Sequence, residues 1–351
     1  MAGAGRAPTP TAIGTDHPGQ HTAVPDSATA AQSRTVRILI VKTSSMGDVV
    51  HALPLAADLA TRLPEAQVDW LVEESFAAIP AMSRHVRHVH RVALRRWRRN
   101  PLQTATWREI ADAKRALRSE RYDWVLDAQG LLKSAWMARW AHAPIAGLSS
   151  DAARERIAAA FYQRRITVPR ALHAVERCRR IGAGVFGYAL DNQPRFDLTV
   201  VPSGTSTHQA VLLANASRAS KLWPEERWIG VERWLAERGL QSVLFWGTPE
   251  EEARVRRLAA SMQRATVAPR SSLEAIAATL AQAQVVIGLD TGLSHLAAAL
   301  GRPTVALYCD YDPALVGLVG DGPVISLGGV DTPPAMGAVI DAARQVLEAR
   351  R

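Results

Sequence analysis

The stretch Val36-Arg-Ile-Leu-Ile-Val-Lys-Thr-Ser-Ser-Met-Gly-Asp48 decides the fold, because an apolar run gives way here to small polar residues. The run up to Val41 is short, β-branched and not alternating, which is typical of a parallel strand buried on both faces. From Gly47 onward, apolar residues recur at the spacing of a helix with one buried face. Residues 43–46 therefore lie between a strand and a helix, at the sheet edge where open α/β proteins bind ligands.

Strand and helix signals alternate through both halves of the chain. In the first half we expect further strands at 68–72, 86–92 and 123–127 and helices at 76–82, 106–119, 129–141 and 171–186. In the second half we expect strands at 210–213, 242–246, 285–287 and 304–307 and helices at 224–238, 250–260, 273–280, 292–300 and 334–349. This pattern predicts an α/β protein with two Rossmann-like parallel-sheet domains that face each other across a cleft.

Length and composition indicate how the chain is divided. The 351 residues, 48% of them apolar, suit two domains of ordinary size. Residues 1–33 are rich in Ala, Thr, Ser, Pro and Gly and nearly lack large apolar side chains, which is typical of disorder. The predicted organisation is a disordered extension (1–33), a first Rossmann-like domain (34–190), a linker (191–205), a second Rossmann-like domain (206–333) and a C-terminal helix (334–351).

The same composition indicates a cytoplasmic protein. The extension lacks the apolar block of a secretory signal, and no apolar run approaches the roughly 20 residues that span a bilayer. Two cysteines, Cys178 and Cys309, are too few for a disulfide framework or a thiolate zinc cluster. His85, His88 and His90 lie in a strongly basic segment without acidic partners, so we expect no metal site there.

Motifs in both halves resemble one enzyme family. They are Val286-Ile-Gly-Leu-Asp-Thr-Gly-Leu-Ser-His-Leu-Ala-Ala-Ala-Leu-Gly-Arg-Pro-Thr-Val305, Lys42-Thr-Ser-Ser-Met-Gly-Asp48 and Lys221-Leu-Trp-Pro-Glu-Glu-Arg-Trp228. Together they are similar to the lipopolysaccharide heptosyltransferases, glycosyltransferases of family 9 with the two-Rossmann-domain architecture called GT-B. The resemblance covers about residues 34–350. The first-half motif resembles the branch that adds the first heptose, whereas the second-heptose branch has a Trp-Val-Gly-Asp-Met type of loop.

The resemblance implies a specific reaction. Its donor is ADP-L-glycero-D-manno-heptose, its acceptor is a Kdo hydroxyl of Kdo-lipid A, and transfer inverts the anomeric carbon. It implies no cofactor and no metal, and a cytoplasmic enzyme held peripherally on the inner face of the inner membrane. A heptosyltransferase II-like member of the same family remains the alternative.

Asp48 is the candidate general base. Inverting transfer needs one group that accepts the proton of the attacking hydroxyl, and Asp48 matches the family's catalytic aspartate. Its place near a helix N-terminus favours the ionised form. The competing interpretation is that Asp48 only caps this helix.

The second half supplies the candidate donor site. The turn from Thr291 to Ser294 joins a strand to a helix, so its backbone N–H groups and the helix dipole favour a diphosphate. Thr291 and Ser294 could also cap this helix, because helix capping and phosphate binding use the same turn geometry. The resemblance places Asp290 on the sugar hydroxyls, and Lys221 and Ser217 at the diphosphate. It places Glu251, with Glu252 as alternative, on the ribose. We also expect donor contacts from Gly292, Leu293, Ser294, His295, Ser44 and Ser45; His295 alternatively packs beneath the loop.

A basic run in the first half is the candidate acceptor site. Residues 84–99 contain seven arginines and no acid, and guanidinium groups suit carboxylates and phosphates. Arg95, Arg96 and Arg99 match basic residues of the family's acceptor-binding loop, and Arg154 is a further candidate. With the formal charge of +9, we expect this run to attract the protein to an anionic membrane, with Trp97 resting in the interface.

Three other functions compete with this interpretation. A nucleic-acid-binding protein would explain the charge but not polar motifs at two sheet edges, so we expect no nucleic-acid partner. A dehydrogenase would need G-x-G-x-x-G after the first strand, and residues 43–47 lack it. Asp310-Tyr-Asp312 has the D-x-D pattern of metal-dependent glycosyltransferases, but its place after a strand favours a turn.

Overall fold

The computed structural model describes residues 35–191, 193–201 and 208–349. The predicted extension (1–33) and part of the predicted linker (191–205) lie outside these described residues. The chain from Thr35 onward forms one compact unit. In the part of the chain that the structure describes, no helix combines the length and the apolar character that crossing a membrane requires.

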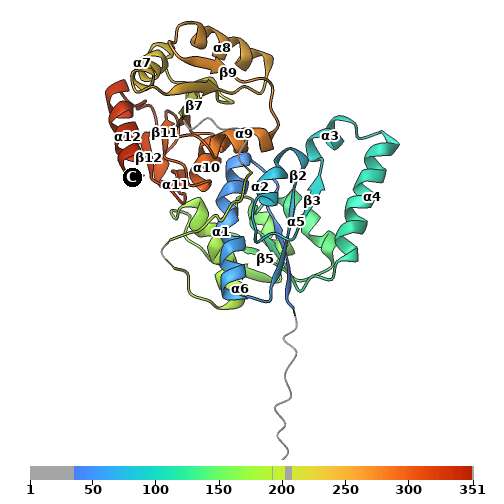
Figure 1. The fold of residues 1–351 in the computed structure, drawn as a ribbon. Coiled ribbons are helices and arrows are strands. Elements are labelled where there is room, and N and C mark those ends of the chain that lie inside the picture. Colours follow the sequence, from blue (N-terminus) through green and yellow to red (C-terminus); the bar gives the residue numbers. More distant parts are fainter. Residues whose placement is uncertain (1–34, 192, 202–207, 350–351) are drawn as a thin grey trace, which may run out of the picture. The chain divides into compact units, whose positions relative to one another are not determined.

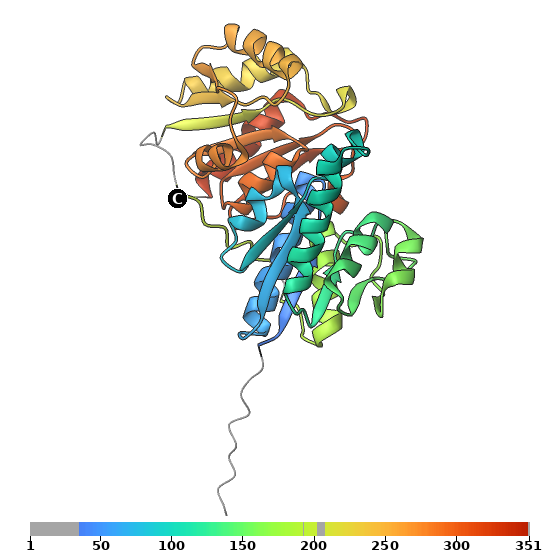
Figure 2. The ribbon, with the colours of Figure 1, turned by 90° about the vertical axis from the view of Figure 1, so that its right-hand side faces the viewer.

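The first half forms a six-stranded parallel sheet, coloured blue to green in Figures 1 and 2. Its strand order is β3-β2-β1-β4-β5-β6. The strands are β1 (Arg37–Val41), β2 (Gln67–Glu73), β3 (His88–Val92), β4 (Trp124–Asp127), β5 (Ile145–Leu148) and β6 (Arg164–Ile166). The helices are α1 (Met46–Arg62), α2 (Ala78–Ala81), α3 (Leu94–Arg99), α4 (Thr104–Ser119), α5 (Leu132–Ala138) and α6 (Ala174–Phe186), with 3₁₀ turns η1 (Glu74–Phe76), η2 (Arg139–Ala141) and η3 (Arg156–Phe161).

The second half forms another six-stranded parallel sheet, coloured yellow to red in the same figures. The strands are β7 (Gln209–Leu213), β8 (Gln241–Leu244), β9 (Ala265–Val267), β10 (Val285–Leu289), β11 (Thr304–Tyr308) and β12 (Val324–Gly328). The helices are α7 (Glu225–Ala236), α8 (Pro249–Ala260), α9 (Leu273–Leu280), α10 (Gly292–Ala299), α11 (Pro313–Val316) and α12 (Met336–Glu348), with the 3₁₀ turn η4 (Ala219–Lys221).

Both sheets have the same topology, which confirms the prediction of two Rossmann-like halves. The order of the second sheet is β12-β11-β10-β7-β8-β9. Read from the β9 end, with β7 counted as the first strand, it is the same as the order of the first sheet. In each sheet the strands are added first to one side of the first strand and then to the other, and this reversal lies between β1 and β4 and between β7 and β10. Ligands of open α/β sheets bind outside the carboxyl ends of the strands at this switch point.

Alternation along β1 explains why its sequence is apolar without a break. Ile38 and Ile40 belong to one buried cluster, and Leu39 and Val41 belong to another on the opposite face. Successive strand side chains point to opposite faces, so a strand covered by helices on both sides needs apolar residues at every position. The sheet is therefore a middle layer, with α1 and α6 packed together on one side.

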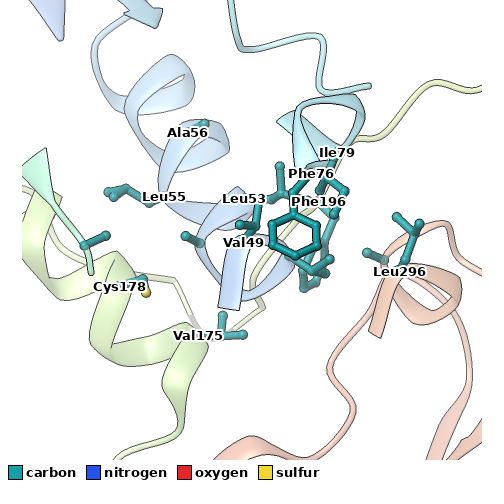
Figure 3. Packing of buried hydrophobic residues seen from close by; sticks show 14 of the residues in the cluster. Val49, Leu53, Leu55, Ala56, Phe76, Ile79, Val175, Cys178, Phe196 and Leu296 are labelled. Carbon is teal, nitrogen blue, oxygen red and sulfur yellow. The ribbon is translucent and has the colours of Figure 1, made fainter. Parts of the chain in front are cut away.

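The two halves share one hydrophobic cluster. It joins Val49 of α1 and Ile79 of α2 to Leu296 of α10. Figure 3 shows Phe196, fully buried although it lies in the predicted linker, among these side chains. Helix α1 thus packs against α6 of its own half and α10 of the other. Burial of this apolar surface holds the two sheet edges close to each other.

The structure corrects several predicted element boundaries. Helix α5 begins at Leu132, not 129, because Asp127 Oδ1 accepts hydrogen bonds from the backbone N–H groups of Gln129 and Gly130 in a turn. The helix predicted at 76–82 is divided into η1 and α2. The sequence pattern did not predict β5, β6, β9 and β12, nor the helices α11 and α3, the latter within the basic run.

A buried ion pair joins α6 to α1. Arg179 donates to both carboxylate oxygens of Asp58, at 2.8 and 2.9 Å, and to the backbone oxygen of Asp191 at 3.0 Å. The side chain of Arg179 is 1% exposed. Burial raises the pKa of Asp58, although Arg179 opposes this effect. The pair is stable only because both charges are satisfied.

Replacing Arg179 with Ala should lower the free energy of unfolding by about 3–5 kcal/mol, because the Asp58 carboxylate would stay buried without its partner. Urea denaturation of the full chain, followed by circular dichroism, measures this change. The matched control is Arg180→Ala, which removes an exposed pair with Glu176 and should cost at most about 0.5 kcal/mol. Equal shifts for the two variants would show that the buried pair adds nothing.

Candidate functional site

Loops from both switch points line a single cavity of about 660 Å³. The loops follow β1, β4, β7 and β10, so each lies at the carboxyl edge of its sheet. From the first half the lining includes Lys42, Ser45, Gly47, Asp48, Gln129 and Arg154, and from the second half Arg218, Lys221, Asp290, Thr291, Gly292 and His295. Eight of the residues predicted for the site are therefore brought together: Asp48, Ser45, Arg154, Lys221, Asp290, Thr291, Gly292 and His295.

Asp48 caps helix α1 and also faces the cavity. Its Oδ2 accepts hydrogen bonds from the backbone N–H and the hydroxyl of Ser45, at 2.9 and 2.8 Å. Its Oδ1 lies 4.0 Å from Nζ of Lys42. Capping and a chemical role were competing interpretations of this residue, but in the structure capping uses only one carboxylate oxygen.

Several charges keep Asp48 ionised. Burial alone raises the pKa of its carboxyl, but Lys42, the two hydrogen bonds from Ser45 and the charge of Arg154 together bring the pKa below its ordinary value of 3.8. Lys42 is itself held by donating to the backbone oxygen of Ala128 at 2.7 Å. A carboxylate in this environment accepts protons weakly, yet it is ionised at every physiological pH.

The N-termini of α1 and α10 meet at the cavity. Cα of Gly292 lies 3.8 Å from the position that a Cβ on Gly47 would occupy, and a Cβ on Gly292 would overlap Met46. Glycine at these two positions therefore permits the close approach of the helices. The free N–H groups and positive dipole ends of both helices are thus close together, which is a suitable environment for an anion.

Lys221 and Asp290 form an ion pair on the second half's side of the cavity. Nζ of Lys221 binds Oδ2 of Asp290 and, at 3.1 Å, its backbone oxygen. Oδ1 of Asp290 lies 3.4 Å from Nε2 of His295. Burial raises the pKa of Asp290, but the opposing effects of His295 and Lys221 are together larger, so the pKa of Asp290 lies below its ordinary value of 3.8. Asp290 is therefore an ionised acceptor held from two sides.

Sequence reasoning missed several residues of the site. His51 is buried, and its Nε2 lies 3.1 Å from Nδ1 of His295. Oε1 of Gln129 accepts hydrogen bonds from the backbone N–H groups of Thr43 and Ser44, at 3.0 and 3.1 Å. His51 lies three residues after Asp48 on α1, and Gln129 follows the end of β4. The helix spacing from Asp48 is the signal that could have identified His51, and the position after β4 is the signal that could have identified Gln129.

Other predicted donor residues have local structural contacts. Ser294 is buried and donates to the backbone oxygen of Leu289 at 2.7 Å, and Leu293 packs against the shared core. Oε2 of Glu251 accepts from the backbone N–H groups of Gly247 and Thr248, which completes the cap of α8. Ser217 is exposed beside Arg218. None of Ser44, Ser217, Glu251, Leu293 and Ser294 is among the cavity-lining residues.

The acidic D-x-D pair and the histidines of the basic run also have partners. Asp312 caps α11 by accepting from the backbone N–H of Ala314 at 2.9 Å. Asp310 accepts from the hydroxyl of Ser220 at 2.7 Å. His85 binds Asp197 and His90 binds Tyr122, each at 2.8 Å.

The basic run is not a purely positive surface. Arg96 donates to the carboxylates of Glu74 and Glu109, with distances between 2.7 and 3.2 Å. Arg95 and Arg99 are exposed, and the Arg95 guanidinium lies over the ring of Phe76. The prediction that Trp97 rests in a membrane interface is wrong, because this side chain is buried and donates to Glu109 at 2.7 Å. Of the four predicted acceptor arginines, only Arg154 lines the cavity.

Comparisons with known proteins agree with this architecture. Residues 110–335 match the family model described as glycosyltransferase family 9 (heptosyltransferase). Lipopolysaccharide heptosyltransferase 1 of Pseudomonas aeruginosa is 43% identical over 81% of this chain and 82% of its own length. The structure of Escherichia coli heptosyltransferase WaaC with ADP has a TM-score of 0.82 and 39% identity, covering 88% of this chain and 99% of that one.

A second structure of the E. coli protein, with ADP-2-deoxy-2-fluoro heptose, has a TM-score of 0.78 and 38% identity over 90% of this chain and all of that one. The family match covers more than half of the chain, and the alignment with the P. aeruginosa relative covers most of both proteins. These similarities confirm the resemblance that the motifs indicated, including the GT-B arrangement of two parallel sheets. The chain belongs to glycosyltransferase family 9, the heptosyltransferases.

Proposed function

We propose that this protein is a lipopolysaccharide heptosyltransferase I. It transfers L-glycero-D-manno-heptose from ADP-heptose to a Kdo hydroxyl of Kdo-lipid A, with inversion at the anomeric carbon. The observation that carries the proposal is the arrangement of the cavity: an ionised Asp48 on one wall and a cationic, dipole-rich anion site on the other. Related proteins named lipopolysaccharide heptosyltransferase 1, and structures of WaaC with ADP and a fluorinated ADP-heptose, support this assignment.

The donor occupies the second half of the cavity. Its diphosphate is stabilised by Lys221 and by the N-terminus of α10 at Thr291 and Gly292. Arg218, which follows the predicted Ser217, adds another cation to the cavity wall. Asp290 accepts hydrogen bonds from sugar hydroxyls, since an ionised carboxylate has no proton to donate and repels phosphate. Ser45 and His295 complete the contacts from the two facing walls.

In the reaction, the acceptor hydroxyl attacks the anomeric carbon from the face opposite the diphosphate. Asp48 accepts the hydroxyl proton as the new carbon–oxygen bond forms, and the bond from the anomeric carbon to the β-phosphate oxygen breaks. ADP leaves with the electron pair. The weak basicity of Asp48 is sufficient because the hydroxyl becomes acidic as it bonds to an oxocarbenium-like carbon.

Incubation of the protein with ADP-heptose and Kdo-lipid A should add one heptose residue to the lipid, which mass spectrometry detects. Asp48→Asn is the matched control, because the amide keeps the shape of the side chain and loses the basic oxygen. We expect a fall in kcat of about 10²–10⁴-fold, the usual value of a general base, with ADP binding retained in calorimetry. No product with the wild-type protein would exclude the proposed reaction, and normal turnover by Asp48→Asn would exclude the assigned base.

Arg154 is the acceptor contact that the cavity supports best. It is exposed, lines the cavity and lies close enough to Asp48 to lower the pKa of that carboxyl. The acceptor carries Kdo carboxylates, which guanidinium groups bind well. Arg95 and Arg99 remain proposed contacts of the lipid A phosphates. Arg96 is a weaker candidate, because two glutamates already bind its guanidinium.

Replacing Arg154 with Ala should raise the KM for Kdo-lipid A by about 10–100-fold, since a hydrogen bond between charged groups would be lost. The KM for ADP-heptose should change little. Arg96→Ala is the matched control and should leave the acceptor KM near its wild-type value. Steady-state kinetics with each substrate varied in turn measures both. A larger acceptor effect from Arg96→Ala would assign the acceptor to the basic run instead.

We further propose that the protein contacts the anionic inner leaflet peripherally, through a face centred on Trp136 of α5. Trp136 is 49% exposed, and Nζ of Lys114 lies 5.4 Å from its ring centroid. Lys133 and Arg139 are exposed beside it. A half-exposed tryptophan among cations fits the interface of an anionic bilayer. Leu132, at the N-terminus of α5, follows Gln129 of the cavity wall closely, so the face adjoins the site.

Trp136→Ala should weaken binding to vesicles that contain phosphatidylglycerol by about three- to tenfold, as sedimentation of the full chain with vesicles measures. Trp107→Ala is the matched control, because Trp107 is also exposed, at 61%, but lies near the N-terminus of α4. We expect high salt to weaken the binding of both variants to these vesicles. Equal loss in the two variants would place the membrane contact elsewhere.

A further inference from the structure

His51 connects the two halves of the site through a buried hydrogen bond. It lies on α1 three residues after Asp48, and its Nε2 is 3.1 Å from Nδ1 of His295 on α10. The two rings meet edge to face, with centroids 4.4 Å apart. The side chains are 5% and 4% exposed. The contact therefore joins the helix of the proposed base to the helix of the proposed diphosphate site.

The direction of this hydrogen bond follows from Asp290. An ionised carboxylate only accepts hydrogen bonds, so Nε2 of His295, 3.4 Å from Oδ1 of Asp290, carries a hydrogen. In a neutral imidazole the other nitrogen then has a lone pair. With Nδ1 of His295 as the acceptor, Nε2 of His51 is the donor.

Positive charge lies close to the pair of histidines. Lys221 already pairs with Asp290, and the positive ends of α1 and α10 adjoin the ring. His51 is neutral, because burial, together with the nearby charge of Lys42, holds its pKa well below 6.5.

A third histidine fixes the other side of His51. His173, which caps α6, has its ring centroid 5.6 Å from that of His51. Its Nδ1 accepts from the backbone N–H of Val175 at 3.2 Å, so its Nε2–H donates to the backbone oxygen of Gly317 at 3.0 Å. The ring of His173 is thus fixed by backbone atoms of both halves.

We propose that His51 is a positioning residue for the transfer: by donating to Nδ1 of His295, it selects the tautomer of His295 that donates to Asp290. The chain of hydrogen bonds runs from His51 through His295 to Asp290, whose second oxygen binds Lys221. This chain sets the orientation of the Asp290 carboxylate, which is proposed to bind the sugar of ADP-heptose, relative to the helix that carries Asp48. This inference rests on the proposed function, whereas the tautomer itself is independent of activity.

The tautomer is tested directly by ¹⁵N NMR of the histidine rings in the full chain, with the His295 signals identified from their absence in His295→Gln. In the wild-type protein near pH 7.5 we expect Nε2 of His295 to be protonated and Nδ1 to be unprotonated. In His51→Leu this pattern should become a mixture of tautomers. In His51→Gln it should persist, because the glutamine amide presents an N–H at a similar reach.

The kinetic constants should rank the variants as the NMR signals do, with His51→Leu impaired and His51→Gln close to the wild-type protein. His51→Leu is expected to raise the KM for ADP-heptose and lower kcat, each by up to about tenfold, the usual value of one neutral hydrogen bond. His51→Gln should recover most of both. His90→Leu is the control for loss of a buried histidine. His90 lies on β3, binds Tyr122 and does not line the cavity, so its loss should reduce stability without changing the KM or the His295 signals.

Two results would overturn the inference. One is an unchanged His295 signal pattern in His51→Leu. The other is equal impairment of the Leu and Gln variants, which would show that His51 acts only by filling space. Failure of the proposed function is distinguishable, because a wild-type protein that transfers no heptose would still report the His295 tautomer.

Discussion

The meeting of two helix N-termini is the constraint on which the site depends. Helices α1 and α10 approach each other at Gly47 and Gly292, where a side chain on Gly292 would overlap Met46. Two positive dipole ends repel each other, so this arrangement needs negative charge nearby. Asp48 and Asp290 supply it, one in the first turn of α1 and the other two residues before α10 begins. The shared apolar core beneath them supplies the remaining attraction between the halves. The arrangement already has the electrostatics that a diphosphate between the helices would need.

Much of the fold and part of the site follow from local sequence. Asp48 and Asp290 both follow buried apolar strands, and strand order alone places them at switch points. The contacts that organise the site do not have a local signal. His51 and His295 are 244 positions apart, and nothing in either segment specifies the other. The missed strands β6 and β9 are only three residues long and lie at sheet edges, where side chains have little periodicity to show.

The basic run illustrates the same limit for charge. Its arginines have no acid within the segment, so the sequence predicts a positive face. In the structure Arg87 binds Asp69 of β2 and Glu120, and Arg96 binds Glu74 and Glu109 from neighbouring elements. Parallel strands and their helices bring acids to these arginines from positions 13 to 33 residues away. The positive charge that the run offers to ligands is therefore smaller than its sequence alone suggests.

In the proposed reaction Asp48 combines two tasks, helix capping and proton acceptance, and their combination determines where rate acceleration arises. Capping by Ser45 and the charge of Lys42 keep the carboxylate ionised but make it a weak base. A weak base contributes little until the acceptor hydroxyl has begun to bond with the anomeric carbon. In the proposed reaction the bond to the leaving diphosphate must therefore be largely broken first, and we expect most of the stabilisation to come from Lys221 and the N-terminus of α10. An enzyme of this design needs its anion site preorganised more than its base activated, which agrees with the close packing of α10 against α1 at Gly47 and Gly292.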